Sequence, residues 1–207
     1  MSGMSELETL LGRKNQRFVC YTGWPEPRPE RHIAYIEHQV QPPAPNAVLS
    51  VLLKRLRAVP EMADFYRRYG SVRLYCDTEG PDSAFYIANP DEWASLKGRF
   101  RDWTDMLDPD EAEEVLPQWL DNYVVFGEIP RSANYYLVPM SGEKTGYVFE
   151  FEHDGFEFIP RGRSFDEFLH YVSNVNDALL QDILCHTRYS DGETETQWLV
   201  EKYQYDD

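Results

Sequence analysis

Residues 146–172 carry the sequence GYVFEFEHDGFEFIPRGRSFDEFLHYV, and this stretch decides the fold. Its first part alternates three aromatic side chains, Tyr147, Phe149 and Phe151, with valine and glutamate. Side chains on a strand point alternately to the two faces of a sheet, so this period of two indicates a half-buried strand with one aromatic face.

A hairpin is expected directly after this strand. The run 153–155 reads His-Asp-Gly, and an Asp-Gly pair between two apolar runs favours a tight turn in which Gly155 adopts a positive φ. The second strand is expected to begin at Phe156 and to end at Pro160, because proline has no N–H to donate to the ladder. Residues 146–159 therefore predict two antiparallel neighbours.

The periodicity changes from two to that of a helix at Ser164. Ser164 and Glu167 have the spacing of a capping box, in which each side chain satisfies an N–H of the first helical turn. The apolar positions that follow fall on one helical face: Phe165, Phe168, Leu169 and Val172. The stretch as a whole predicts the order strand, turn, strand, helix.

The same criteria applied outward predict an α+β fold with a mostly antiparallel sheet packed by several helices. The packing helices are expected within 46–69, 90–107 and 164–184, and a short acidic helix is expected from Pro109 to before Pro117. A short helix is also expected over 5–11. Further strands are expected at 18–21, 33–37, 72–76, 84–88, 123–129, 135–140 and 198–200. The 135–140 strand is expected to pair with 146–151 across the turn at 141–144.

The 146–172 stretch resembles the C-terminal half of the SUKH superfamily, the bacterial immunity proteins and the fungal cell-wall-synthesis regulators. In that group a glycine precedes a strand, a His-Asp turn follows, and a Ser-Phe-x-x-Phe-Leu helix closes the domain. Two upstream pieces agree in order, the run from Val59 through Tyr69-Gly70 and the strand 125–129. The resemblance implies a single SUKH-like domain that binds another protein without catalysis.

Length and composition are consistent with one domain and two extensions. The 207 residues include 42% hydrophobic and 14% aromatic residues, which suffices for a real core. We expect a partly extended, Pro-rich N-terminal extension over 1–45, a SUKH-like core over 46–175, and a C-terminal helix end with an extended tail packed on the core over 176–207. The cysteines, Cys20, Cys76 and Cys185, have neither zinc nor Cys-x-x-Cys spacing, which predicts free thiols in a reducing cytoplasm.

The net charge of −16 is unevenly distributed. Residues 1–60 hold five acids and eight bases (+3), so residues 61–207 hold 31 acids and 12 bases (−19). The window 102–130 contains nine acids and no Lys or Arg. Such a field repels nucleic acid and attracts basic proteins, although a solubilising face is an equally simple interpretation.

The predicted partner is therefore a basic protein such as a toxin domain, with neither nucleic acid nor a membrane as partner. The resemblance implies that the chain is an immunity protein that neutralises a cognate toxin, for example a nuclease. The candidate partner-binding residues are Asp105, Asp108, Asp110, Glu111, Glu113 and Glu114, with Tyr135 and Tyr136 as apolar anchors. An intracellular regulatory or scaffold protein with a cellular partner is the alternative.

No catalytic motif is evident in the sequence. It contains no Gly-x-Ser-x-Gly, no phosphate-binding glycine loop and no dinucleotide fingerprint. His153-Asp154 resembles a metal-binding pair, but its position in a hairpin turn favours a structural role, and we expect no metal and no cofactor. A carboxylate-based hydrolase is the third hypothesis, and it requires acids that converge in a concave pocket.

Overall fold

The computed structural model describes residues 2–13, 16–22, 31–78, 83–174 and 198–204, and of 16–22, 31–34, 77 and 198–204 only the backbone. The strands are β1 (Gln16–Thr22), β2 (Arg31–Gln41), β3 (Ser71–Asp77), β4 (Phe85–Ile87), β5 (Tyr123–Ile129), β6 (Asn134–Pro139), β7 (Val148–Glu152), β8 (Glu157–Gly162) and β9 (Trp198–Gln204). The α-helices are α1 (Gly3–Leu11), α2 (Asn46–Arg55), α3 (Pro60–Arg68), α4 (Trp93–Thr104), α5 (Pro109–Val115) and α6 (Phe165–Ser173). Two 3₁₀ turns, η1 (Leu56–Ala58) and η2 (Gln118–Asp121), complete the set.

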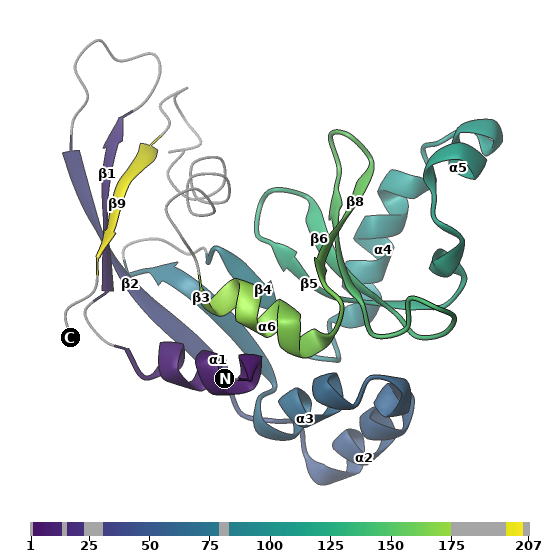
Figure 1. Cartoon of the computed structure of the whole chain (residues 1–207), viewed down its shortest axis with the longest axis horizontal. Helices are drawn as coiled ribbons and strands as arrows, with labels where there is room; N and C mark the ends of the chain where they lie inside the picture. The colour runs from purple at the N-terminus through teal and green to yellow at the C-terminus, as the bar shows by residue number, and fades with distance from the viewer. Residues whose placement is uncertain (1, 14–15, 23–30, 79–82, 175–197, 205–207) are drawn as a thin grey trace.

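The strands β2 to β8 form an antiparallel sheet in which each strand pairs with its neighbour in the sequence. The backbones of β1 and β9 extend it beyond β2, so the full order is β8-β7-β6-β5-β4-β3-β2-β1-β9 (Figure 1). Antiparallel neighbours need only short connections. The helices α2 and α3 are inserted between β2 and β3, and α4 and α5 between β4 and β5.

Helices cover both faces of the sheet. On one face α4 contributes Phe100, whose ring lies 5.0 Å from that of Phe151 on β7. On the other face α6 contributes Phe168, whose ring lies 4.9 Å from that of Tyr136 on β6 and 5.4 Å from that of Phe126 on β5. Because both faces are covered, consecutive residues of the central strands are buried: all but one of the β5 side chains are buried, as are all but one of those of β6.

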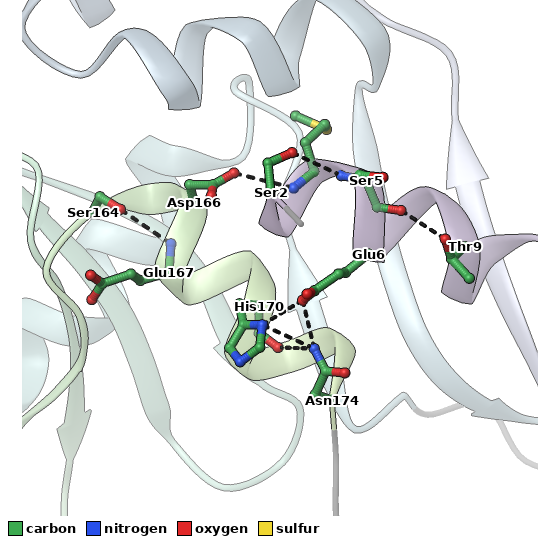
Figure 2. A network of polar contacts seen from close by, with 10 residues as sticks. Ser2, Ser5, Glu6, Thr9, Ser164, Asp166, Glu167, His170 and Asn174 are labelled. Carbon is green, nitrogen blue, oxygen red and sulfur yellow. Dashed lines mark hydrogen bonds and ion pairs between the residues drawn. The ribbon is translucent and has the colours of Figure 1, made fainter.

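The helix α1 lies against α6, as Figure 2 shows from close by. The two backbones approach so closely that a Cβ added at Gly3 would lie 1.9 Å from the carbonyl oxygen of Asp166. Leu7 and Leu10 of α1 are fully or almost fully buried in the common core. The domain boundary predicted at residue 45 stays a prediction, but these leucines belong to the same core as the sheet.

Polar contacts complete this helix pair. The carboxylate of Glu6 accepts hydrogen bonds from the Asn174 amide at 2.7 Å and lies 2.5 Å from Nδ1 of His170 (Figure 2). The backbone N–H of Met4 donates to the carboxylate of Asp166 at 3.3 Å. The residues joined by these contacts are therefore distant in the sequence, with separations of 162, 164 and 168 residues.

The predicted α+β fold class is confirmed, and so is the pairing of β6 with β7. Three local predictions need correction. The positive φ of the β7–β8 turn is at Phe156 (52°), not at Gly155, because the loop has four residues and its last one turns the chain into β8. The strand β8 continues through Pro160 to Gly162, since β8 is an edge strand and can lack one N–H.

The third correction concerns the helix that begins after Ser164. The Ser164 hydroxyl accepts the N–H of Glu167 as predicted, but the Glu167 carboxylate accepts the N–H of Arg163 at 2.8 Å instead of that of Ser164. The helix α6 ends at Ser173, and the predicted continuation over 175–184 lies outside the described residues. Cys76 is buried, and its thiol donates a hydrogen bond to the carbonyl oxygen of Arg73 at 3.7 Å, whereas the side chains of Cys20 and Cys185 lie outside the description. Among the helices described, none is long and apolar enough to cross a membrane.

Candidate protein-binding surface

The helix α5 is built by local signals alone. Pro109 occupies the first helical turn, where its missing N–H costs nothing, and the Glu111 carboxylate accepts the N–H of Asp108 at 3.2 Å. Leu116 leaves the helix in an extended conformation, as expected of a residue that precedes proline. Along its whole length α5 has no buried residue.

The sequence-predicted acids lie on and just before this helix. All six are exposed, and in the described part of the chain none of them has a Lys or Arg partner within ion-pair distance. We call these six residues the acidic surface: Asp105, Asp108, Asp110, Glu111, Glu113 and Glu114. Figure 1 shows α5 at the margin of the molecule, beyond the end of α4 and away from the sheet.

Two exposed apolar side chains accompany the acidic surface. Met106, in the turn between α4 and α5, is 64% exposed, and Val115, the last residue of α5, is 39% exposed. Neither residue was among the predicted binding residues, although both lie in the same acidic window. In the sequence, neither residue continues the apolar face of α4, which buries Trp93, Leu96 and Phe100. This mismatch was the signal that could have indicated their exposure.

The prediction of Tyr135 and Tyr136 as exposed anchors is wrong. Tyr136 is fully buried against Phe168 of α6, and Tyr135 is 4% exposed and faces Phe100 of α4. The two are consecutive residues of β6, so they point to opposite faces of a sheet that is covered on both sides. Both tyrosines are core residues, and Met106 and Val115 are the exposed apolar side chains of this region.

The His153-Asp154 pair forms the β7–β8 turn together with Glu152. The two oxygens of Glu152 accept the N–H groups of Asp154 at 3.1 Å and Gly155 at 2.7 Å. Nδ1 of His153 lies 2.9 Å from the Asn134 side-chain oxygen, and its Nε2 lies 3.1 Å from the Asp154 carboxylate. One possible ligand atom from each of Glu152, His153 and Asp154 lies within 4.8 Å of the others. Among the described residues, this is the group in which three side chains of metal-ligating type come together. Their hydrogen bonds give each of them a structural task in the turn.

A buried carboxylate lies close to this turn, and sequence reasoning did not single it out. Glu150 on β7 is 3% exposed, and its carboxylate accepts hydrogen bonds from Arg161 at 2.8 Å and from the Asn134 amide at 3.3 Å. Burial lowers the pKa of Arg161, but the adjacent Glu150 raises it more, so the pKa lies above its ordinary value. The signal available was a glutamate between Phe149 and Phe151 in a strand with two covered faces. The ion pair between Glu150 on β7 and Arg161 on β8 links the edge strand β8 to the sheet.

Acids also line a hollow between α1, α3 and α6, with a volume of about 410 Å³. Glu8 on its wall pairs with Arg68, and Asp64 pairs with Arg67. Asp166 accepts the N–H of Met4. Glu8 and Asp64 are therefore paired with cations, whereas among the described residues no carboxylate of the acidic surface has a Lys or Arg partner.

No family model, curated protein or solved structure matches the chain.

Proposed function

We propose that the chain is a non-catalytic protein-binding module that holds a basic protein on the acidic surface. The observation that carries the proposal is that α5 buries no residue, yet it presents the acidic surface beside exposed Met106 and Val115. An isolated helix of seven residues is marginal in water, so helices of this length normally rely on packing against the core. A bound partner supplies that packing for α5.

The two kinds of side chain have different tasks in such a complex. The carboxylates accelerate association, because a charged surface steers an oppositely charged partner and raises the association rate by about 10- to 1,000-fold. Apolar contacts to Met106 and Val115 slow dissociation, since buried apolar area supplies most of the affinity of an interface. The net charge of −19 over residues 61–207 extends the steering field well beyond α5.

The resemblance to the SUKH superfamily supports a particular kind of partner. Immunity proteins of that group neutralise toxins, and a nuclease toxin needs a basic surface to bind its phosphate-rich substrate. An acidic surface that covers such a region competes directly with nucleic acid. The chain is thus proposed to be an immunity protein for a cognate toxin with a basic active face.

The test starts from affinity capture with the full chain, followed by mass spectrometry of the bound proteins. The variant Glu113→Lys/Glu114→Lys reverses two charges of the acidic surface and leaves the capping Glu111 in place. The control variant Glu143→Lys/Glu157→Lys makes the same change in net charge at exposed acids elsewhere. The control is expected to retain the partner that the wild-type chain captures, and the acidic-surface variant to lose it.

Binding kinetics with the purified partner complete the test. The association rate of the acidic-surface variant should fall about 10- to 100-fold at low salt, and the difference should shrink as salt is added. The dissociation rate should change less. An association rate equal to that of the control variant would refute the acidic surface as the binding site.

A further inference from the structure

The β7–β8 turn brings together an imidazole and two carboxylates that the proposed function does not use. Nε2 of His153 lies 3.1 Å from a carboxylate oxygen of Asp154, and a ligand atom of Glu152 lies within 4.8 Å of both side chains. In the part of the chain that the structure describes, neither carboxylate forms an ion pair with a Lys or Arg. Two negative charges therefore lie beside one ring nitrogen without a Lys or Arg counter-charge.

The proton on the imidazole is placed by a residue outside this group. The Asn134 amide donates to the Glu150 carboxylate at 3.3 Å, so the amide oxygen is the atom directed at His153. This oxygen accepts the backbone N–H of His153 at 3.3 Å and lies 2.9 Å from Nδ1. An amide oxygen only accepts, so Nδ1 carries a proton and donates it. The lone pair of the neutral ring is therefore on Nε2, the nitrogen beside Asp154.

The imidazole is also held in place on both sides. Asn134 is fixed by Glu150, which is 3% exposed and paired with Arg161 at 2.8 Å. The ring of Trp103 on α4 lies 4.8 Å from that of His153, whose side chain is 22% exposed. Metal-binding histidines are commonly oriented in this way, by a second ring nitrogen that donates to an oxygen and by an apolar shell. The ring is thus preorganised as a metal ligand.

A positively charged species is needed beside Nε2. The lone pair of Nε2 and the Asp154 carboxylate both accept, and two acceptors 3.1 Å apart repel each other unless a cation lies next to them. A proton on Nε2 neutralises this pair but leaves Glu152 without a cation, whereas a metal ion serves all three groups. The Glu152 oxygens accept the N–H groups of Asp154 and Gly155 and still have lone pairs for a metal, so the structural task in the turn is compatible with ligation.

We infer that Glu152, His153 and Asp154 form a binding site for a divalent transition-metal ion of the zinc type. In a tetrahedral zinc site with bonds of about 2.0–2.2 Å, neighbouring ligand atoms lie about 3.3 Å apart. The 3.1 Å between Nε2 and the Asp154 oxygen is already close to this separation. The Asp154 side chain is 84% exposed, so rotation about its own bonds can complete the geometry without a change in the core.

The ligand set decides the class of metal and leaves one position open. An imidazole nitrogen favours Zn²⁺ over Mg²⁺ and Ca²⁺, which are bound almost entirely by oxygen. Three protein ligands leave the fourth tetrahedral position to water or to a donor atom of another molecule. The inference goes beyond the proposed function, because none of the three ligands belongs to the acidic surface.

Calorimetric titration of the chelator-treated full chain with Zn²⁺ tests the site. The wild type should bind one ion per chain with micromolar affinity. His153→Gln and Asp154→Asn each remove a ligand, so each should weaken binding at least about 10-fold, the loss that follows even from removing an outer hydrogen bond. The matched control His170→Gln removes another histidine that lies beside a carboxylate, that of Glu6, and should bind Zn²⁺ like the wild type.

Nitrogen-detected NMR of the histidine rings locates the ion. Zn²⁺ should shift the Nε2 resonance of His153 and leave Nδ1 protonated, and the same concentration of Mg²⁺ or Ca²⁺ should leave both resonances in place. Either of two results would overturn the inference: a wild-type chain that shows no saturable binding up to millimolar Zn²⁺, or His153→Gln and Asp154→Asn variants that are folded by circular dichroism and bind like the wild type.

The outcome is separable from that of the proposed function. Glu113→Lys/Glu114→Lys changes the acidic surface but none of the three ligands, so this variant should lose the basic partner and still bind one Zn²⁺. His153→Gln keeps every carboxylate of the acidic surface and should still capture the partner.

Discussion

The helices α1 and α5 are both short, but they are attached to the molecule in opposite ways. The helix α1 buries Leu7 and Leu10, approaches α6 backbone to backbone at Gly3, and is joined to it through Glu6. The helix α5 buries no residue and is held by its caps and the flanking turns. Since tertiary packing supplies most of the stability of a short helix, α1 belongs to the cooperative core and α5 does not.

The difference in burial between α1 and α5 indicates where function is expected. Removing an apolar side chain from α1 removes contacts that the whole fold shares, whereas a change in α5 affects the surface alone. Side chains that do not support the core are free to serve binding, and α5 together with the turn before it presents six exposed carboxylates in one place. The following predictions test whether the two helices differ as strongly as their burial indicates.

The largest difference is expected from truncating one apolar side chain in each helix. Leu7→Ala leaves a cavity in the core and should lower the free energy of unfolding by about 2–5 kcal/mol. Val115→Ala removes a side chain that is 39% exposed and should change it by less than about 0.5 kcal/mol. Urea denaturation of both variants measures the two values. Equal losses would mean that α5 is part of the core after all.

A smaller effect is expected from the carboxylate that joins α1 to α6. Burial raises the pKa of Glu6, but the hydrogen bonds from His170 and Asn174 lower it more, so its pKa lies below the usual value of 4.5. A carboxylate with a lowered pKa in the folded state stabilises the fold above the pKa of the unfolded state. That contribution is lost as the pH falls through the lowered pKa of the folded state.

The variant Glu6→Gln should therefore lose about 0.5–1 kcal/mol near neutral pH, and this loss should shrink as the pH falls below about 4.5. Urea denaturation at several pH values measures the free energy of unfolding of both proteins. The exposed Glu143, in the β6–β7 turn, provides the control Glu143→Gln, which should show no such pH dependence. A loss for Glu6→Gln that stays constant down to about pH 3 would mean that the network in Figure 2 does not lower the pKa of Glu6.

Much of the fold follows from local patterns in the sequence. The strand predicted at 123–129 has the bounds of β5, and the helix predicted from Pro109 to before Pro117 is α5. These elements are marked by alternation, prolines and caps, which act over a few residues. The prediction that Gly155 would adopt the positive φ was wrong because the loop length, which depends on the register of β7 and β8, decides which residue turns the chain.

The site was less predictable, because exposure depends on contacts between distant segments. Tyr135 and Tyr136 look like any exposed tyrosine pair in the sequence, but α4 and α6 cover the two faces of β6. Periodicity along one strand cannot say whether its second face is covered. The acids were found because a charge run is visible without knowledge of the fold, and the structure places all six on the surface. Their role in binding stays a prediction.

The smallest global effect is expected from the caps, and it separates the two helices most directly. In α5 the Glu111 carboxylate accepts the N–H of Asp108, and in α1 the Ser2 hydroxyl accepts the N–H of Ser5 at 3.3 Å. Each cap contributes about 0.5–1 kcal/mol to its own helix. Ser2→Ala should lower the free energy of unfolding by this amount, because α1 unfolds together with the core.

Glu111→Ala should instead leave the global free energy of unfolding unchanged within about 0.3 kcal/mol, since α5 can unravel while the core stays folded. Its effect should be local, a roughly 2- to 5-fold faster hydrogen exchange of the amides of α5 with unchanged exchange in β5 and α4. Hydrogen exchange measured by mass spectrometry or NMR separates the two results. A global loss equal to that of Ser2→Ala would mean that α5 is coupled to the core, and it would remove the argument that α5 is retained for binding.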